Sequence, residues 1–258
     1  MIPVGDFIRR STTPVVNWSL ISVNIAIFVY MLTLGSQPTM LLNGVPISEA
    51  NKFLYDFGFV PSCVADYFGV ATHANPLAMR LACPPDHREP VQVFTAMFVH
   101  AGWAHIFGNM LFLWIFGDNV EDRMGHGRYL LFYIVCGLVA AITQIAMATS
   151  TTLPSVGASG AIAGVLAGYL ILYPKAIVQV VILPLFFLPF FVPAVVLIGV
   201  WFLMQLFAGV LELGQTTTAG SGVAWWAHVG GFACGAVLIW FFKRSQAPPE
   251  ERFVREFD

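Results

Sequence analysis

The sequence has little charge. Only 10% of its 258 residues are Asp, Glu, Lys or Arg, whereas a soluble domain carries about 25% charged residues. The 12 basic residues are outnumbered by 14 acidic ones, so no basic face for a nucleic acid is expected. Hydrophobic residues make up 58% of the chain, which excludes an ordinary soluble globule, a disordered chain and a disulfide-rich secreted module. The class that remains is a polytopic membrane protein.

Charge is absent altogether from five long runs, which are bounded by Arg10 and Glu49, Glu89 and Asp118, Arg128 and Lys175, Lys175 and Glu212, and Glu212 and Lys243. A transmembrane helix needs about 20 apolar residues, so the third run is long enough for two helices. The fourth contains three prolines, and its first half is expected to be an interfacial or cytoplasmic loop. Six spans are predicted, at 16–34, 104–120, 129–148, 157–173, 193–211 and 223–242. The expected fold class is all-α, a polytopic bundle of six transmembrane helices with a long first external loop.

The positions of Lys and Arg predict the orientation, because these residues accumulate in cytoplasmic loops. Nine of them fall on the side of the two termini, and the three on the other side all lie in the first loop. Both termini are therefore predicted to be cytoplasmic. The expected division is a cytoplasmic N-terminus (1–15), a membrane domain (16–242) that includes the external loop (35–103), and a cytoplasmic tail (243–258). No cleavable signal peptide is expected, because residues 1–10 lack an apolar core.

Cysteine is also scarce, with four residues in the chain. Cys136 and Cys234 fall inside predicted spans and are interpreted as small packing residues. Cys63 and Cys83 both fall in the external loop, where an oxidising compartment would allow a disulfide between them. The sequence leaves that pairing open. The loop is too long for a simple connection and is expected to have structure of its own.

Polar side chains inside a membrane are costly and mark functional sites. His105 and Asn109 stand near the start of the second span, Ser159 near the start of the fourth and His228 near the start of the sixth. These three spans run from outside to inside, so the four side chains lie in the outer half of the bilayer at comparable depth. Each of them, taken alone, could be a packing residue or a hydrogen-bonded core residue. Four such residues at one depth favour a functional site. His100 is interpreted as a loop or interface residue.

Small residues recur at four-residue spacing in two of these spans. They are Gly160, Gly164 and Gly168 in the fourth span and Ala227, Gly231 and Gly235 in the sixth. Such stripes let helix backbones approach closely in lipid, so the fourth and sixth spans are predicted to pack against each other. That contact would bring Ser159 within hydrogen-bond reach of His228.

A serine beside a histidine is a nucleophile beside a general base. His228 would take the proton of Ser159 and later give it to the leaving amine, since an imidazole suits both steps near neutral pH. Backbone N–H groups at the start of the fourth span, together with His105 and Asn109, are candidates to stabilise the oxyanion. No intramembrane Asp or Glu is placed to orient His228, so a dyad is predicted rather than a triad.

Four segments combine these features in one order along the chain. They are residues 98–109 (FVHAGWAHIFGN), 121–125 (EDRMG), 157–160 (GASG) and 227–231 (AHVGG). In order and spacing they resemble the rhomboid family of intramembrane serine proteases, over residues 92–242. The resemblance implies Ser159 as nucleophile, His228 as base, and His105, Asn109 and the Ser159 backbone N–H as the oxyanion site.

The resemblance also implies that the chain cleaves a transmembrane helix of another protein near its extracytoplasmic end. A lateral gate is implied in the fifth helix, with Trp201, Phe202 and Phe207, and in the loop at 212–222. Three features depart from some members of the family. Ala163 stands where they have an aromatic residue four positions after the nucleophile, no Trp-Arg pair occurs in the first loop, and this loop is longer than in compact members.

The leading functional hypothesis is an intramembrane serine endopeptidase that acts on single-pass transmembrane proteins within membrane lipid. The alternative is a non-catalytic helix-binding chaperone or adaptor of the rhomboid-like type, which would keep the binding surface without the chemistry. A transporter would show two related halves with broken helices, and the sequence shows no such halves. It also shows no metal or nucleotide motif, so no cofactor is expected. The compact six-span plan favours the inner membrane of a bacterial-type cell, and the oligomeric state is left open.

Overall fold

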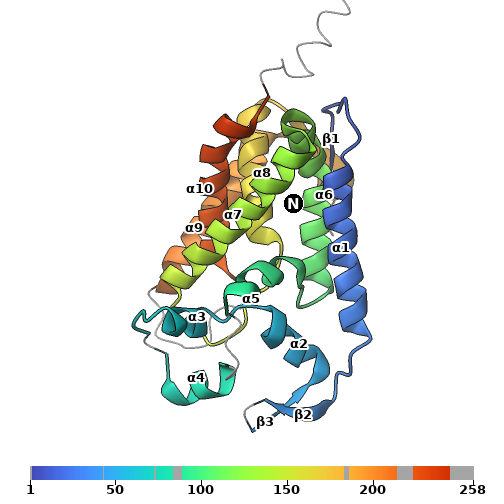
Figure 1. Ribbon diagram of the computed structural model, residues 1–258. Coiled ribbons are helices and arrows are strands. Elements are labelled where there is room, and N and C mark those ends of the chain that lie inside the picture. The colour runs from blue at the N-terminus through green and yellow to red at the C-terminus, as the bar shows by residue number, and fades with distance from the viewer. Residues whose placement is uncertain are drawn as a thin grey trace, which may run out of the picture.

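The computed structural model describes residues 2–42, 44–72, 74–83, 89–182, 186–213 and 223–244. Within these residues, six helices form a bundle (Figure 1). They are α1 (Val15–Leu32), α6 (Trp103–Met124), α7 (His126–Met147), α8 (Ser159–Leu172), α9 (Ala194–Leu213) and α10 (Trp225–Phe242). Each overlaps one of the predicted spans, so the expected helical membrane bundle is confirmed.

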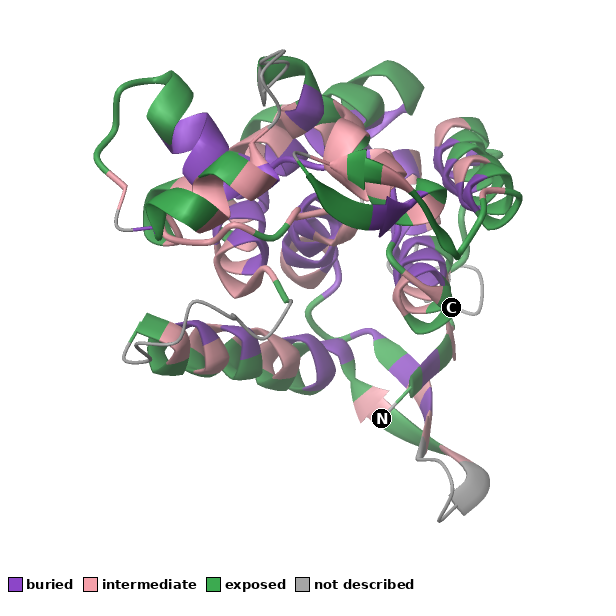
Figure 2. Ribbon diagram, turned by 90° about the horizontal axis from the view of Figure 1, so that it is seen from below, coloured by how far each residue is buried: buried purple, intermediate pink, exposed green. Residues whose placement is uncertain are grey.

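The outward faces of the bundle are apolar. Four helices, α1, α7, α9 and α10, are long and apolar enough to cross a membrane, and α6 qualifies together with the preceding helical segment 90–98, from which it is bent by 81°. Exposed residues lie mainly on the outer faces of the helices (Figure 2), and on α9 these are large apolar side chains such as Val200, Leu203 and Phe207. A surface of this kind is stable in lipid, so the chain is a multi-pass membrane protein.

Helix α8 is the centre of the bundle. It packs against α6, α7, α9 and α10, and residues 160–169 are all buried. A helix that is apolar on all sides is expected in such a position. Its 14 residues span about 21 Å at 1.5 Å per residue, which is less than the roughly 30 Å hydrocarbon core of a bilayer. The first residue of α8, Ser159, therefore lies below the surface of the membrane if the other end reaches the opposite boundary.

The long first loop is folded, as predicted. It contains a two-stranded sheet of β2 (Pro38–Leu42) and β3 (Val45–Ser48), followed by α2 (Glu49–Phe57), α3 (Pro61–Tyr67), α4 (Pro76–Ala82), α5 (Glu89–Thr95) and the 3-10 turn η1 (Ala96–Phe98). A disulfide joins Cys63 to Cys83, which settles the pairing that the sequence left open. Backbone hydrogen bonds between Phe59 and Ser155 attach this loop to the segment that leads into α8.

A second sheet lies at the opposite end of the bundle (Figure 1). It consists of β1 (Ile2–Asp6), β4 (Ile177–Ile182) and β5 (Phe186–Pro193), in the antiparallel order β1-β4-β5. The sequence predicted a loop between α8 and α9, and the strands in this region were missed. The sheet runs directly into α9, whose first residue, Ala194, donates a backbone hydrogen bond to Ala176. Figure 1 shows β1 and the end of α10 at this same end of the bundle.

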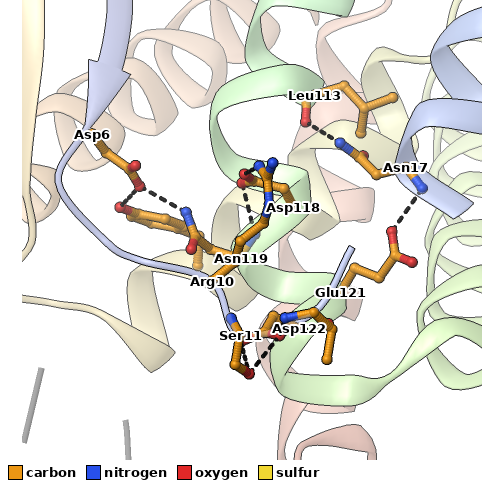
Figure 3. Close-up of polar contacts among 11 residues, drawn as sticks. Asp6, Arg10, Ser11, Asn17, Leu113, Asp118, Asn119, Glu121 and Asp122 are labelled. Carbon is orange, nitrogen blue, oxygen red and sulfur yellow. Dashed lines mark hydrogen bonds and ion pairs between the residues drawn. The ribbon is translucent and has the colours of Figure 1, made fainter. Parts of the chain in front are cut away.

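Polar contacts hold the N-terminal segment against the end of α6 (Figure 3). The carboxylate of Glu121 is fully buried and accepts hydrogen bonds from the backbone N–H groups of Val16 and Asn17, at 3.0 and 2.7 Å. These N–H groups belong to the first turn of α1, where they have no partner within the helix. Asp122 accepts hydrogen bonds from Ser11 and Thr12 in the same way. The acidic end of α6 therefore fixes where α1 begins.

Candidate active site

The site rests on a close contact between α8 and α10. A Cβ atom on Gly231 would lie 1.9 Å from the carbonyl oxygen of Gly160, and one on Gly235 would lie 2.3 Å from that of Gly164. Both distances are shorter than any van der Waals contact, so only glycine allows the two backbones to approach this closely. The predicted packing of the two glycine stripes is confirmed.

This contact brings a hydroxyl group to an imidazole. Ser159 is the first residue of α8, and His228 lies in the first turn of α10. The Oγ of Ser159 is 2.7 Å from the Nε2 of His228. The predicted hydrogen bond is therefore present, and the imidazole is only 8% exposed. The pair has the geometry in which a base removes the proton of a nucleophile.

The other nitrogen of His228 has a partner that sequence reasoning missed. Its Nδ1 is 2.7 Å from the Oε1 of Gln205 on α9. The indole rings of Trp201 and Trp225 also lie beside the imidazole, with ring centroids 5.8 and 6.4 Å away. The signal in the sequence was a glutamine in the middle of the otherwise apolar span at 193–211.

His105 and Asn109 approach the start of α8 from α6. They lie beside Gly157, whose φ of +124° belongs to the region that favours glycine. A Cβ atom at this position would be 2.6 Å from the Nε2 of His105 and 3.5 Å from the Nδ2 of Asn109. Gly157 thus leaves the space in which both side-chain nitrogens reach the turn before Ser159. Their part in an oxyanion site stays a prediction.

His100 lies closer to the site than its interpretation as a loop or interface residue suggested. The side chain is 1% exposed, and its Nε2 accepts a hydrogen bond of 2.8 Å from the Nδ2 of Asn109. A nitrogen that accepts from an amide N–H carries no proton, so the His100 ring is neutral in this arrangement. No feature of the sequence pattern pointed to this contact.

The predicted residues line one cavity of about 530 Å³. Its walls include His105, Asn109, Ser159 and His228, and also Trp201. Residues 153–156, which connect the folded first loop to α8, form another part of the lining. The structure therefore brings four polar groups from three helices together around a single space that is large enough for several residues of a peptide.

The residues expected in the gate occupy different positions on α9. Trp201 lines the cavity, and Phe202 stacks on Phe232 of α10 with ring centroids 4.2 Å apart. Phe207 faces outward and is 67% exposed. In the loop predicted at 212–222, residues 214–222 lie outside the described residues, as does the tail from residue 245 onward. In the part of the chain that the structure describes, no group of three or more His, Cys, Asp or Glu side chains is arranged to hold a metal ion.

Comparison with known proteins gives a family match. The Rhomboid domain matches residues 87–245, which include α6 to α10 and all four polar residues of the cavity. The matched region begins at residue 87, just before α5, so most of the folded first loop lies outside it.

Curated relatives share parts of the same region. The presenilin-associated rhomboid-like protein, mitochondrial, of Bos taurus is 29% identical over 142 residues, which are 54% of this chain and 35% of that protein. Rhomboid-like protein 11, chloroplastic, of Arabidopsis thaliana is 30% identical over 179 residues, 64% of this chain and 57% of the relative. Rhomboid protease GluP of Bacillus subtilis is 39% identical over 79 residues, 31% of this chain and 15% of GluP. The matches thus span 15% to 57% of these relatives.

Proposed function

The chain belongs to the rhomboid family, and on this basis we propose that it is an intramembrane serine endopeptidase. It cleaves transmembrane helices of other membrane proteins near their extracytoplasmic ends. The observation that carries the proposal is the 2.7 Å contact between the Ser159 Oγ and the His228 Nε2 on the wall of the cavity. A relative named as a protease, GluP, supports the same activity.

The proposed chemistry follows from these positions. His228 removes the proton of Ser159 while the Oγ attacks the carbonyl carbon of the substrate, and it then protonates the leaving amine. The oxyanion receives hydrogen bonds from His105, from Asn109 and from the backbone N–H of Ser159, which as the first residue of α8 has no helical partner for that N–H. In the second half of the reaction His228 removes a proton from a water molecule, which attacks the acyl carbonyl. His228 then returns the proton to the Oγ of Ser159 as the acyl group leaves.

The substrate class follows from the environment of the dyad. A transmembrane helix has its amides hydrogen-bonded internally, so its end must unwind before a peptide bond can reach Ser159. We expect small residues such as Ala, Gly or Ser near the scissile bond, because they ease this unwinding. Entry past α9 is consistent with its position, since Trp201 faces the cavity while Phe207 faces outward.

A non-catalytic binder of membrane helices is the alternative. Such a protein would keep the apolar cavity walls but would need no aligned nucleophile and base. The hydrogen bond between Ser159 and His228 favours the protease, because a binder gains nothing from this particular pair of groups.

Covalent labelling separates the two functions. We expect a fluorophosphonate probe to modify Ser159 in the purified protein, with the adduct mapped by mass spectrometry. Ser159→Ala and His228→Ala should both abolish the modification. Ser155→Ala, which removes another hydroxyl from the cavity wall, should retain it. An unlabelled wild-type protein with its fold intact would support the binder.

A further inference from the structure

The polar side chain of Gln205 is unusual for its position on α9. Across this helix, which is described along its full length, the buried residues are Ala194, Leu197, Ile198, Gln205 and Gly209, and Gln205 is the only polar one among them. The neighbouring Leu203 and Met204 are 63% and 62% exposed and face outward. A buried amide in a membrane helix is costly unless it is hydrogen-bonded, and the partner of Gln205 is His228.

This hydrogen bond decides which nitrogen of His228 carries the proton. The amide oxygen of Gln205 can only accept, so the Nδ1 at 2.7 Å must be the N–H donor. The Nε2 of a neutral imidazole then has a free lone pair, and it faces the Ser159 Oγ at 2.7 Å. This is the tautomer that a general base requires. With the opposite tautomer, Nε2 would already hold a proton and could not remove that of Ser159.

We propose that Gln205 is the positioning residue of the dyad, and that it holds His228 in the active tautomer only while α9 is docked on α10. The inference rests on the proposed protease function and extends it. The amide of Gln205 thus takes the orienting role that a carboxylate has in a Ser-His-Asp triad. The amide belongs to α9, the helix that is expected to move away from α10 when a substrate enters. His228 is therefore fully oriented only after α9 packs against α10 again.

The outer part of α9 docks on α10 at a glycine. A Cβ atom on Gly209 would lie 3.2 Å from the Cε2 of Trp226 and 3.4 Å from the Cβ of Trp225. A larger side chain here would therefore push α9 away one turn from Gln205 without altering Gln205 itself. Gly199, on the same helix, has no atom within 4 Å of its Cβ position, so it provides the matched control.

The first test replaces the acceptor. Gln205→Met keeps the length of the side chain and removes the oxygen, whereas Gln205→Glu keeps an acceptor at the same distance. We expect Gln205→Met to lower kcat for a transmembrane substrate in proteoliposomes by roughly 10- to 100-fold, the range known for orienting partners of metal-bound histidines, with KM nearly unchanged. Gln205→Glu should recover most of the activity. Met204→Leu, on the outward face, should behave as wild type.

The second measurement reads the tautomer directly. In protein labelled with ¹⁵N-histidine, His228 should show a protonated Nδ1 and an unprotonated Nε2, with the signal identified by its loss in His228→Ala. Gln205→Met and Gly209→Val should both reduce this population and slow fluorophosphonate labelling of Ser159, while Gly199→Val should leave both unchanged. A purely structural role would instead lower the thermal stability of Gln205→Met and leave its tautomer unchanged.

Each outcome has a defined meaning. A protonated Nε2 in wild type, or wild-type kcat in Gln205→Met, overturns the positioning role of Gln205. An unchanged tautomer in Gly209→Val overturns the dependence on α9 docking. Absence of Ser159 labelling in wild type overturns the protease function instead, because the tautomer is measured independently of the reaction.

Discussion

The polar groups of the cavity are ordinary side chains whose roles depend on their neighbours. Asn109 illustrates this, because its amide is held by His100 on one side while it faces the turn at Gly157 on the other. The Nε2 of His100 accepts this hydrogen bond and so carries no proton, which means that the ring is neutral while it holds the Asn109 amide.

A substitution of Asn109 tests its proposed part in the oxyanion site. Asn109→Ala should lower kcat by roughly 10²- to 10³-fold, as for the loss of one oxyanion donor in other serine proteases, with little change in KM. The measurement is steady-state cleavage of a transmembrane substrate in proteoliposomes. An unchanged kcat in a folded variant would remove Asn109 from the oxyanion site.

At the residue scale, the sequence predicted the groups that stand out chemically in an apolar chain. Ser159, His228, His105 and Asn109 were found because polar residues near the start of three separate spans imply one depth. Gln205 and His100 were missed for different reasons. Gln205 was missed because only polar residues near the starts of spans were compared, although its distance from the outer end of the span at 193–211 gives it a similar depth. His100 lies outside the predicted spans, where a polar residue needs no explanation.

The close contact between α8 and α10 requires glycine at particular positions. We expect Gly231→Ala to destabilise the protein by about 1–3 kcal/mol, the usual cost of overpacking, because the added Cβ would lie 1.9 Å from a backbone oxygen that cannot move independently. The same change should weaken labelling of Ser159. Both effects can be measured by unfolding in detergent and by fluorophosphonate reactivity.

Gly199→Ala is the matched control for that variant, because its Cβ would meet open space. It should leave stability unchanged or raise it by up to about 1 kcal/mol, since alanine has the higher helix propensity. Equal stability of the two variants would show that the α8–α10 contact is less close than described.

The strand β1 introduces a dependence on pH at the opposite end of the bundle. The pKa of Asp6 is raised from its ordinary value of 3.8 to about 7, chiefly by burial and to a smaller extent by the nearby Asp118, against the hydrogen bond that Asp6 accepts from Tyr169 (Figure 3). Because the folded protein then binds one more proton than the unfolded chain between these two values, stability falls as the pH rises from about 4 to about 7 and is constant above.

The variant Asp6→Asn isolates this effect, since an amide does not ionise. The thermal stability of wild type relative to Asp6→Asn should decrease from about pH 4 to about pH 7 and then level off. A difference that stays constant over this range, or that increases with pH, would show that Asp6 is charged in the folded protein.

At the element scale, the sequence predicted the helices but missed the sheet formed by β1, β4 and β5. The region before α9 is a continuous apolar stretch with three prolines, which shows neither the alternation of a half-buried strand nor the period of a helix. The pairing of β1 with β4 joins residues 2–6 to residues 178–181, and no local pattern specifies a contact so distant in the sequence.

The whole molecule places two different folded parts at its two ends. The first loop, with its disulfide, stands at one end, and the β1-β4-β5 sheet stands at the other (Figure 1). The alternation of the predicted spans places the first loop at the end opposite the two termini, whereas the assignment of the termini to the cytoplasm rests on the distribution of Lys and Arg and stays a prediction. The internal structure of the first loop could not be predicted, because its contacts with the segment before α8 are set by tertiary packing.

Cysteine accessibility tests the proposed orientation. In intact cells, a membrane-impermeant maleimide should fail to modify Cys63 or Cys83 until an external reductant is added, and it should then modify both. The reason is that the proposed orientation puts the disulfide on the external side, where oxidising conditions would preserve it. Modification that requires permeabilised cells would place the first loop in the cytoplasm.

The central claim is that Ser159, activated by His228, cleaves a peptide bond within the membrane. Its most direct test is the incubation of the purified protein with a single-pass transmembrane protein in proteoliposomes, followed by mass spectrometry of the products. We expect wild type to produce two fragments cut at one bond near the extracytoplasmic end of the helix, and Ser159→Ala to produce none. Equal cleavage by the folded Ser159→Ala variant would contradict the claim.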